Sequence, residues 1–390
     1  MIILAIESSC DETAAAILKD CDLLSNVVVS QIDIFKAYGG VIPEVAARSH
    51  LEAILPVIDQ ALAGARVTWN DITHIAVTHT PGLLGSLLIG TLTARTLAIL
   101  HNKPLYAVHH LKSHIYSNWL EATQTPEFPL LALVISGGHT QIIKMQKHND
   151  FQIIGTTLDD AVGECFDKIA KILGLPYPGG PSIAEAAKSA NPEKYHFPHP
   201  QTPNSLDFSF SGLKTAVLRQ VQQECGVAIN YPSHDLKNLL TPEQINDFAA
   251  SFQKTAIEIL LEKLDLALLK HKDIKSIVFA GGVSANEKLR SMASGENVFR
   301  RGFNPLPKTE ETYIPDGDEG AQWNDVPAGL RRTPTKTFDR KRAISIFFPE
   351  PRFSGDNAAM VAEAAYWEIK SGVNPTDPYK LTLAPRSILC

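Results

Sequence analysis

The chain has 390 residues, of which 44% are hydrophobic and 20% are charged, and its net charge is −6. This apolar content suffices for two hydrophobic cores, and the acidic balance gives no overall support for nucleic-acid binding beyond a local basic patch. No apolar run reaches membrane-spanning length, the first residues do not resemble a targeting peptide, and the five cysteines lack disulfide-like spacing. We therefore expect a cytoplasmic protein that makes no membrane contact.

The chain opens with three predicted strands, which cover residues 2–7, 13–18 and 23–31. A polar turn joins the first two strands, so they form a hairpin whose tip can face a ligand. Asp11 and Glu12 lie at this tip. They are either catalytic carboxylates or ordinary turn residues.

Alternating helices and strands follow a loop at residues 38–43. The predicted elements are a helix over 44–63, a strand over 72–78, a helix over 87–100, a strand over 104–108 and a helix that runs on to residue 120. On the last helix, His110 and His114 lie at positions i and i+4 and project from one face. Two imidazoles so placed can share a metal ion, although a lone pair of this kind is as often structural. Leu111 stands where zinc peptidase helices carry a catalytic glutamate, so the pair indicates a metal but not peptide hydrolysis.

The pattern of three strands restarts after a linker at residues 126–129, and we interpret it as a diverged internal duplication. The repeated strands cover residues 130–135, 140–145 and 151–156. Gly137 and Gly138 lie in the turn between the first two, where the lack of a Cβ lets backbone N–H groups approach a phosphate. A helix over 162–173 carries Asp167, whose ordinary explanation is an ion pair with Lys171. We expect residues 177–181 to form a rigid loop.

The last third of the chain contains two further helix starts. The predicted elements are a helix over 241–270, a strand over 274–280, a helix from Gly281 through Arg290, a strand over 344–348 and a helix over 354–371. A strand, a glycine turn and a helix N-terminus together favour binding of an anion or a nucleotide. Asp356 is either a third metal ligand or the cap of its helix. Periodicity disappears over about 292–340, which indicates an inserted loop.

Six motifs occur in the order and spacing of one known family. They lie at residues 7–13, 38–44, 109–114, 136–141, 208–214 and 281–286. With these motifs the chain resembles the tRNA N6-adenosine threonylcarbamoyltransferase family, and the sequence at 177–181 resembles its bacterial branch.

The resemblance implies an α/β fold with two RNase H-like lobes of the actin, Hsp70 and sugar-kinase (ASKHA) type and a central nucleotide cleft. We expect residues 1–125 to form the N-terminal lobe, joined by a C-terminal helix over 355–390. Residues 126–354 are expected to form the second lobe, which includes the irregular insert at about 292–340.

The resemblance also implies the activity and its site. The family transfers a threonylcarbamoyl group from threonylcarbamoyl-AMP to the N6 amine of adenosine 37 in tRNAs that read ANN codons, and AMP is released. It implies one divalent metal ion, Fe2+ first and Zn2+ as the alternative, held by His110, His114 and Asp356. The implied substrate-binding residues are Val134, Ile135, Ser136, Gly137, Gly138, Asp167, Gly180 and Asn286. Asp11 and Glu12 are the implied catalytic pair, one of which is our candidate base for the adenine amine. The implied partners are tRNA, a paralogous dimerisation subunit and a small ATPase.

The chain departs from the family pattern at the insert and at Phe353-Ser354-Gly355, where a Cys-Thr or Ser-Thr pair usually precedes the aspartate.

Three alternative functions remain to be weighed. A metallopeptidase would need the glutamate that Leu111 replaces. An ATPase or kinase of the same fold would usually carry an aspartate at Ser136. A non-catalytic paralogue would lack the metal histidines, which this chain keeps.

Overall fold

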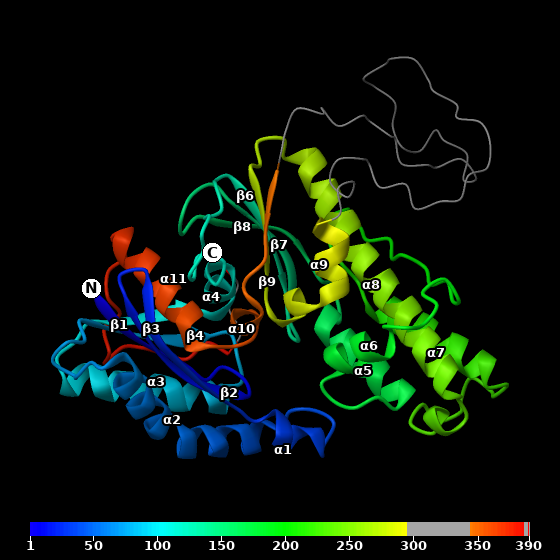
Figure 1. Ribbon diagram of the computed structural model, residues 1–390, viewed down its shortest axis with the longest axis horizontal. Helices are drawn as coiled ribbons and strands as arrows, with labels where there is room; N and C mark the ends of the chain where they lie inside the picture. The colour runs from blue at the N-terminus through cyan, green and yellow to red at the C-terminus, as the bar shows by residue number, and fades with distance from the viewer. Residues whose placement is uncertain (295–343, 386–388, 390) are drawn as a thin grey trace.

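The computed structural model describes residues 1–294, 344–385 and 389, and it contains two five-stranded sheets of the same topology (Figure 1). The strand order is β3-β2-β1-β4-β5 in the first sheet and β8-β7-β6-β9-β10 in the second. In both sheets the leading strand pairs antiparallel with the next strand and parallel with the fourth. The internal duplication predicted from the repeated strand pattern is therefore confirmed.

The strands agree closely with the predicted ones. Their bounds are β1 Ile2–Glu7, β2 Glu12–Lys19, β3 Asp22–Ser30, β4 His74–Thr80, β5 Leu105–His109, β6 Leu130–Ile135, β7 Thr140–Met145, β8 Phe151–Thr156, β9 Ser276–Ala280 and β10 Ser345–Phe347. Four of them, β1, β6, β7 and β8, coincide with the predicted residues.

The helices connect the strands and cover the sheets. Their bounds are α1 Ile32–Lys36, α2 Pro43–Ala65, α3 Leu84–Leu100, α4 His110–Tyr116, α5 Val162–Leu173, α6 Gly179–Ala186, α7 Ser211–Glu224, α8 Pro242–Lys270, α9 Glu287–Ser294, α10 Pro351–Ser354 and α11 Ala358–Lys370, with short 3-10 turns η1 Leu236–Asn238 and η2 Gly282–Ala285. Within the described ranges, none of these helices is both long and apolar enough to span a membrane.

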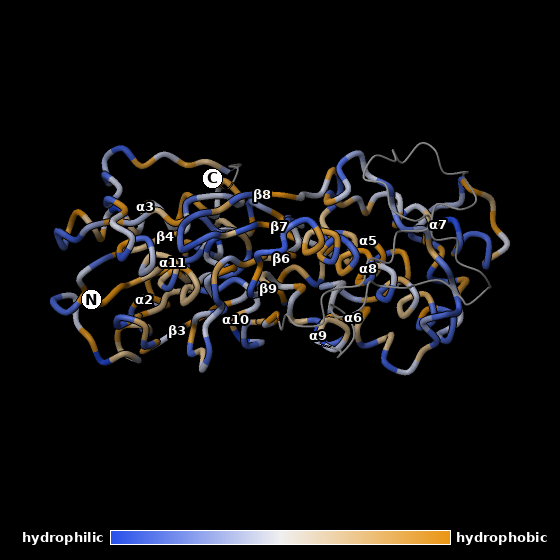
Figure 2. Tube along the Cα trace, turned by 90° about the horizontal axis from the view of Figure 1, so that it is seen from above, coloured by the Kyte–Doolittle hydropathy of each residue, from blue (hydrophilic) through white to orange (hydrophobic). Residues whose placement is uncertain are grey.

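The side chains of the leading strands alternate between two cores, as the period of two in a strand requires. In β1, Leu4 and Ile6 face a core under α2 and α3, whereas Ile3 and Ala5 face a core that contains α4 and α11. The even-numbered residues of β6 join this second core, so it lies between the two sheets. The odd-numbered residues of β6 face a third core under α5 and α8. Figure 2 shows the chain from above, with α2 and α3 toward one end of the molecule and α7 toward the other.

The helix expected to reach residue 120 ends at Tyr116. Side chains beyond it bind the carbonyl groups that further helical turns would use: the Ser117 hydroxyl donates to the His114 carbonyl at 2.6 Å, and the Asn118 amide donates to the Ile115 carbonyl at 3.2 Å. The Asn118 amide also donates to the carbonyl of Phe279 in β9, at 3.0 Å. Asn118 therefore ends α4 and fixes it to the second sheet.

The prediction of a loop at 177–181 is wrong in its second half, because α6 begins at Gly179. A Cβ at Gly179 would lie 2.5 Å from the Cα of Asp167 and 2.5 Å from the carbonyl oxygen of Phe166, both in α5. This glycine therefore permits close packing of two helices. The expected helix after Gly281 also differs, since it is divided into η2 and α9.

The C-terminal helix expected over 355–390 is shorter than predicted. The chain forms the short α10, an extended segment that contains Asp356, and then α11, which ends at Lys370. Helix α11 packs on β1 and β2 of the first sheet. The first residues of the insert expected at about 292–340 belong to α9, and the remainder of that range lies outside the described residues.

Residues 191–203, all of which are described, form no helix or strand and are fixed to α8 through His199. The His199 Nδ1 atom lies 2.8 Å from a carboxylate oxygen of Glu262, and its Nε2 atom lies 3.7 Å from one of Glu258. The carboxylates of Glu258 and Glu262 outweigh burial and raise the pKa of His199 to about 9.

This raised pKa predicts a pH-dependent contribution of His199 to stability. The contribution is fully present below the ordinary histidine pKa of about 6.5 and is lost as pH rises through the folded-state value near 9. We expect His199→Gln to lower the urea midpoint at about pH 6 and to have little effect at about pH 10. The exposed His234 supplies the control substitution. An equal loss at both pH values would contradict the prediction.

Candidate active site and metal centre

The two candidate metal ligands on α4 come from a junction where a strand leads directly into a helix. Strand β5 ends at His109, whose side chain caps α4 by accepting a hydrogen bond from Leu111 N at 3.2 Å. The helix then presents His110 and His114 on one face, with their ring centroids 4.5 Å apart. Both side chains are buried.

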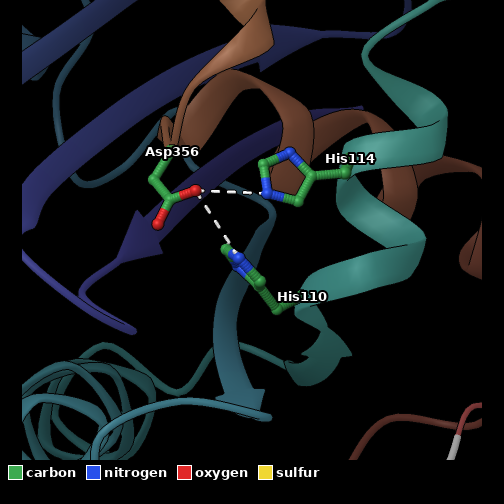
Figure 3. Close-up of side chains that lie close together, drawn as sticks. All are labelled: His110, His114 and Asp356. Atoms are coloured by element: carbon green, nitrogen blue, oxygen red, sulfur yellow. Dashed lines mark ion pairs between the residues drawn. The ribbon is translucent and has the colours of Figure 1, made fainter. Parts of the chain in front are cut away.

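Asp356 lies in the extended segment between α10 and α11, and it does not cap a helix. Asn357 is the cap of α11, since its side-chain oxygen accepts from Met360 N at 3.0 Å. The capping explanation for Asp356 is therefore wrong. Its Oδ1 atom lies 3.1 Å from Nε2 of His114 and 3.5 Å from Nε2 of His110 (Figure 3).

The donor atoms of these three residues fit a single metal ion. One ligand atom from each residue can be chosen so that all three lie within 4.8 Å of one another. Two imidazoles with one carboxylate are a donor set found in catalytic zinc sites and in non-haem iron sites. The three side chains therefore have both the chemistry and the spacing of a metal centre.

The charges around this centre favour a cation. Burial disfavours a charged His110 ring, but the carboxylates of Asp356 and Glu7 outweigh it and raise the pKa of His110 to about 9. Burial would raise the pKa of Asp356, but the two histidines lower it to about 2. Burial and the neighbouring His110 charge lower the pKa of His114, so the cluster stabilises one positive charge better than two.

Arg290, on α9, holds the segment that leads to Asp356. Its Nη2 atom donates to the carbonyl of Pro349 at 2.7 Å and lies 3.3 Å from the hydroxyl of Ser354, while Nε donates to the carbonyl of Ser284 at 2.8 Å. The guanidinium also lies over the ring of Phe348, 5.0 Å from its centroid. The third ligand is thus fixed to the second sheet on its N-terminal side.

We expect Arg290→Ala to weaken metal binding by about one order of magnitude, because outer groups that orient metal ligands typically contribute 10–100-fold to affinity. Competition with a chelator of known affinity measures the effect. Arg352→Ala is the matched control: Arg352 lies on the same segment but pairs with Glu350 and Glu121 at the surface. Equal metal affinities of the Arg290→Ala and wild-type proteins would contradict this role.

The tip of the first hairpin faces the metal ligands. Glu12 begins β2, and one of its carboxylate oxygens accepts from the Ser30 hydroxyl at 3.1 Å. Burial, followed by the negative charges of Asp356 and Asp11, raises the pKa of Glu12 well above its usual value of 4.5. Because the charge of Asp356 acts on Glu12, Glu12 lies within electrostatic range of the metal ligands. Whether Asp11 and Glu12 are catalytic stays a prediction.

The turn of the second hairpin lies against the same region. Val134 and Ile135 are buried at the end of β6, and the Cβ positions of Gly137 and Gly138 have open space around them. Burial and then the charges of His110 and His114 lower the pKa of the next residue, His139, to about 4. The predicted phosphate-binding turn and the candidate metal ligands therefore lie close enough to interact electrostatically.

Helix α5 supports this turn through Gly163. Its backbone N–H donates to the carbonyl of Ser136 at 3.2 Å, and a Cβ at Gly163 would lie 2.6 Å from that oxygen and 2.9 Å from the Cα of Gly137. Only a glycine lets the helix approach the turn so closely. The sequence pattern assigned Gly163 no role.

The remaining predicted substrate residues surround the α5–α6 contact and the start of α9. Asp167 accepts from Gly179 N at 2.7 Å and makes no ion pair with Lys171 among the described residues, so that ordinary explanation is wrong. Gly180 follows with open space at its Cβ position. Asn286 donates to the side-chain oxygen of Gln253 at 2.9 Å and accepts from Leu289 N at 3.0 Å. Their binding roles stay predictions.

Two lobes with sheets of identical strand order define the class of protein: this is a two-lobed α/β protein of the actin-like ASKHA type. Two solved structures show the same fold, and at their low sequence identity they show the fold alone. The HypF protein of T. kodakarensis aligns with a TM-score of 0.56 and 12% identity, over 95% of this chain and 48% of its own. Full-length HypF in a phosphate- and nucleotide-bound form aligns with a TM-score of 0.51 and 13% identity, over 95% and 55%.

The chain belongs to the tRNA N6-adenosine threonylcarbamoyltransferase family, whose family model matches residues 22–310. A curated relative of that name from Symbiobacterium thermophilum is 42% identical over 373 residues, which cover 95% of this chain and 93% of the relative. One from Kosmotoga olearia is 44% identical over 380 residues, or 97% and 96%. The family prediction is confirmed, and the protein is a transferase that acts in tRNA modification.

Proposed function

We propose that this enzyme transfers the threonylcarbamoyl group from threonylcarbamoyl-AMP to the N6 amine of adenosine 37 in tRNAs that read ANN codons, with release of AMP. The observation that carries the proposal is the cluster of His110, His114 and Asp356 beside the open glycine turn of the second hairpin. In a chain of this family, a metal centre next to a phosphate-binding turn suits an acyl-adenylate substrate.

His110, His114 and Asp356 would hold one divalent metal ion, Fe2+ in the first instance and Zn2+ as the alternative. Both metals bind two imidazoles and a carboxylate in other enzymes. When bound, such an ion supplies Lewis-acid polarisation of a carbonyl oxygen.

The adenylate would bind along the second hairpin. Strand β6 ends at the site with Val134 and Ile135. The N–H groups of Gly137 and Gly138 can approach the phosphate because no Cβ blocks them. Ser136, Asp167, Gly180 and Asn286 complete the predicted contacts. Burial and the charge of Asp11 on the first hairpin contribute to a raised pKa of Asp167, which supports a site between the two hairpins.

In the transfer itself, the adenine amine attacks the carbamoyl carbon, a C–N bond forms and the C–O bond to AMP breaks. The donor is already an activated anhydride, so no covalent enzyme intermediate is needed and positioning supplies much of the acceleration. The amine must lose a proton. Glu12 or Asp11 accepts it. The raised pKa of Glu12 makes its carboxylate a stronger base than that of an ordinary glutamate.

We also propose that residues 1–125, together with the C-terminal helix, form one lobe, that residues 126–354 form the other, and that the enzyme works in the cytoplasm. The packing of α11 on β1 and β2 supports this division. The partners would be tRNA, a paralogous dimerisation subunit and a small ATPase subunit.

An apolar surface on α2 and α3 supports the paralogous subunit as a partner. These two helices pack together on one face of the first sheet (Figure 1). Five of their exposed leucines are spaced four residues apart along each helix: Leu51, Leu55, Leu84, Leu88 and Leu92. Every one of them is at least 40% exposed. An apolar stripe of this kind on a pair of helices suits another pair of amphipathic helices.

We expect Leu88→Asp to abolish the complex with the paralogous subunit, since a charge at the centre of an apolar interface is left desolvated and unpaired. Size-exclusion chromatography of the mixed proteins measures complex formation. Leu239→Asp, which changes an exposed leucine elsewhere, is the control. A Leu88→Asp protein that still forms the complex would place the interface on another surface.

The proposed function is tested with the metal-loaded protein, its partner subunits, threonylcarbamoyl-AMP and unmodified tRNA. Nucleoside mass spectrometry of the digested tRNA should show threonylcarbamoyl-adenosine, and a tRNA with guanosine at position 37 should remain unmodified. Absence of the product with every component present would overturn the proposal. Cleavage of an added protein substrate would instead favour the metallopeptidase alternative.

A further inference from the structure

The last residue of β1 is a fully buried acid that follows five apolar residues. Strand β1 has the sequence Ile-Ile-Leu-Ala-Ile-Glu, and the side chain of Glu7 has no exposed surface. A buried carboxylate is costly unless polar groups surround it. Glu7 is not among the residues that the family resemblance assigned to the site, so its partners decide its role.

Both carboxylate oxygens of Glu7 are held by neighbouring groups. Oε1 accepts from Ser9 N at 2.5 Å, in the turn that follows β1. Oε2 accepts from the hydroxyl of Thr78 in β4 at 2.6 Å and lies 3.3 Å from Nδ1 of His110. The Ser9 hydroxyl lies 3.2 Å from the same ring nitrogen. These contacts fix the orientation of the carboxylate toward one edge of the His110 ring.

The two nitrogens of His110 thus face different partners. Nε2 faces Asp356 and the candidate metal position, whereas Nδ1 faces Glu7. An imidazole that donates a proton from Nδ1 to a carboxylate leaves the lone pair of Nε2 free for a metal ion. His114 differs, because its buried Nδ1 atom has no hydrogen-bond partner among the described residues.

We infer that Glu7 is a positioning residue for the metal centre: it fixes the tautomer and ring orientation of His110, and Thr78 and Ser9 in turn fix Glu7. The inference rests on the proposed metal site. A carboxylate that accepts the distal N–H of a ligand histidine also makes that ring a stronger donor. The two histidines of the site would therefore be unequal ligands, with His110 the oriented and more basic one.

The test is the metal affinity of the full-length chain, measured with Zn2+ by competition with a chelator and with Co2+ by its visible absorption spectrum. Glu7→Gln keeps the shape of the side chain but removes its charge, and we expect Zn2+ affinity to fall by about 10–100-fold. We also expect the Co2+ spectrum to change. Thr78→Val, which removes only the hydroxyl that holds Glu7, should give a smaller loss in the same direction.

A double-mutant comparison separates positioning from a general effect on folding. In a His114→Ala background, where His110 remains, Glu7→Gln should still weaken the residual binding. In a His110→Ala background, Glu7→Gln should cause no further loss of metal affinity. Unchanged Zn2+ affinity and Co2+ spectrum in both Glu7→Gln and Thr78→Val would overturn the inference about Glu7 but not the proposed metal site. A wild-type chain that binds neither ion would overturn the metal proposal, and with it this inference, whereas the transfer assay above tests the function separately.

Discussion

Replacing His110 or His114 with alanine is expected to weaken metal binding so far that the isolated protein carries no metal, and to lower transfer activity by about three orders of magnitude, because metal polarisation of a carbonyl contributes several kcal/mol to the transition state. Each residue supplies one of the three donor atoms, and both histidine side chains are buried. Metal analysis and single-turnover transfer rates on the same preparations measure the two effects.

Lys112→Ala is the matched control for these variants. Lys112 lies between the two histidines on α4, but its ammonium group points toward Glu368 and the ring of Phe151. This variant should retain metal and activity. A folded His110→Ala protein that transfers the acyl group at the wild-type rate would show that the metal cluster has no part in the reaction, even if the family assignment stands.

Glu12→Gln is expected to lower the transfer rate by about 10^2–10^4-fold while the metal content stays unchanged, the usual range for loss of a general base. The amide keeps the hydrogen bond from Ser30 but cannot accept the amine proton. Comparison with Asp11→Asn identifies which of the two carboxylates is the base. Asp22→Asn is the control, since Asp22 lies at the opposite end of the same hairpin sheet. Equal rates for wild type and Glu12→Gln would remove Glu12 from the mechanism.

The pH dependence of the rate should follow from the same group. Glu12 can accept a proton only when it is ionised, so the rate should fall as pH is lowered through its pKa. That pKa is raised by burial first and by the charges of Asp356 and Asp11 next, so the acidic limb should lie above pH 4.5. A metal ion would offset the charge of Asp356, but burial and Asp11 remain. The Glu12→Gln profile should lack this limb.

The sheets could be predicted from the sequence because their signals are local. The apolar runs of β6, β7 and β8 end at polar turns, and a capping box formed by Thr241 and Gln244 marks the start of α8. The helix boundaries that were missed depend on contacts remote in sequence. Gly179 begins a helix because it packs on α5, and α4 ends where Asn118 binds Phe279.

The site residues also divide into those that the local sequence indicates and those that depend on contacts remote in sequence. His110 and His114 are recognisable from their spacing on one helix. For Asp356 the local sequence left a metal ligand and a helix cap as equal alternatives, and the family resemblance favoured the ligand, since no periodicity links Asp356 to α4. The roles of Glu7, Thr78 and Arg290 depend on side chains that meet across the two sheets, and only the three-dimensional arrangement shows them. The one local sign of Glu7 is an acid at the end of an apolar strand.

The attachment of α9 and β10 to the second sheet has a consequence for protein engineering. Helix α9 ends at Ser294, β10 begins at Ser345 and pairs with β9, and Arg290 on α9 donates to the carbonyl of Pro349, two residues after β10. The positions at which the chain leaves and rejoins the described fold are therefore anchored independently of the length between them. Changes of sequence between these two points, such as an added affinity tag, should therefore leave Asp356 in place, because the Arg290 contacts that hold its segment lie outside them.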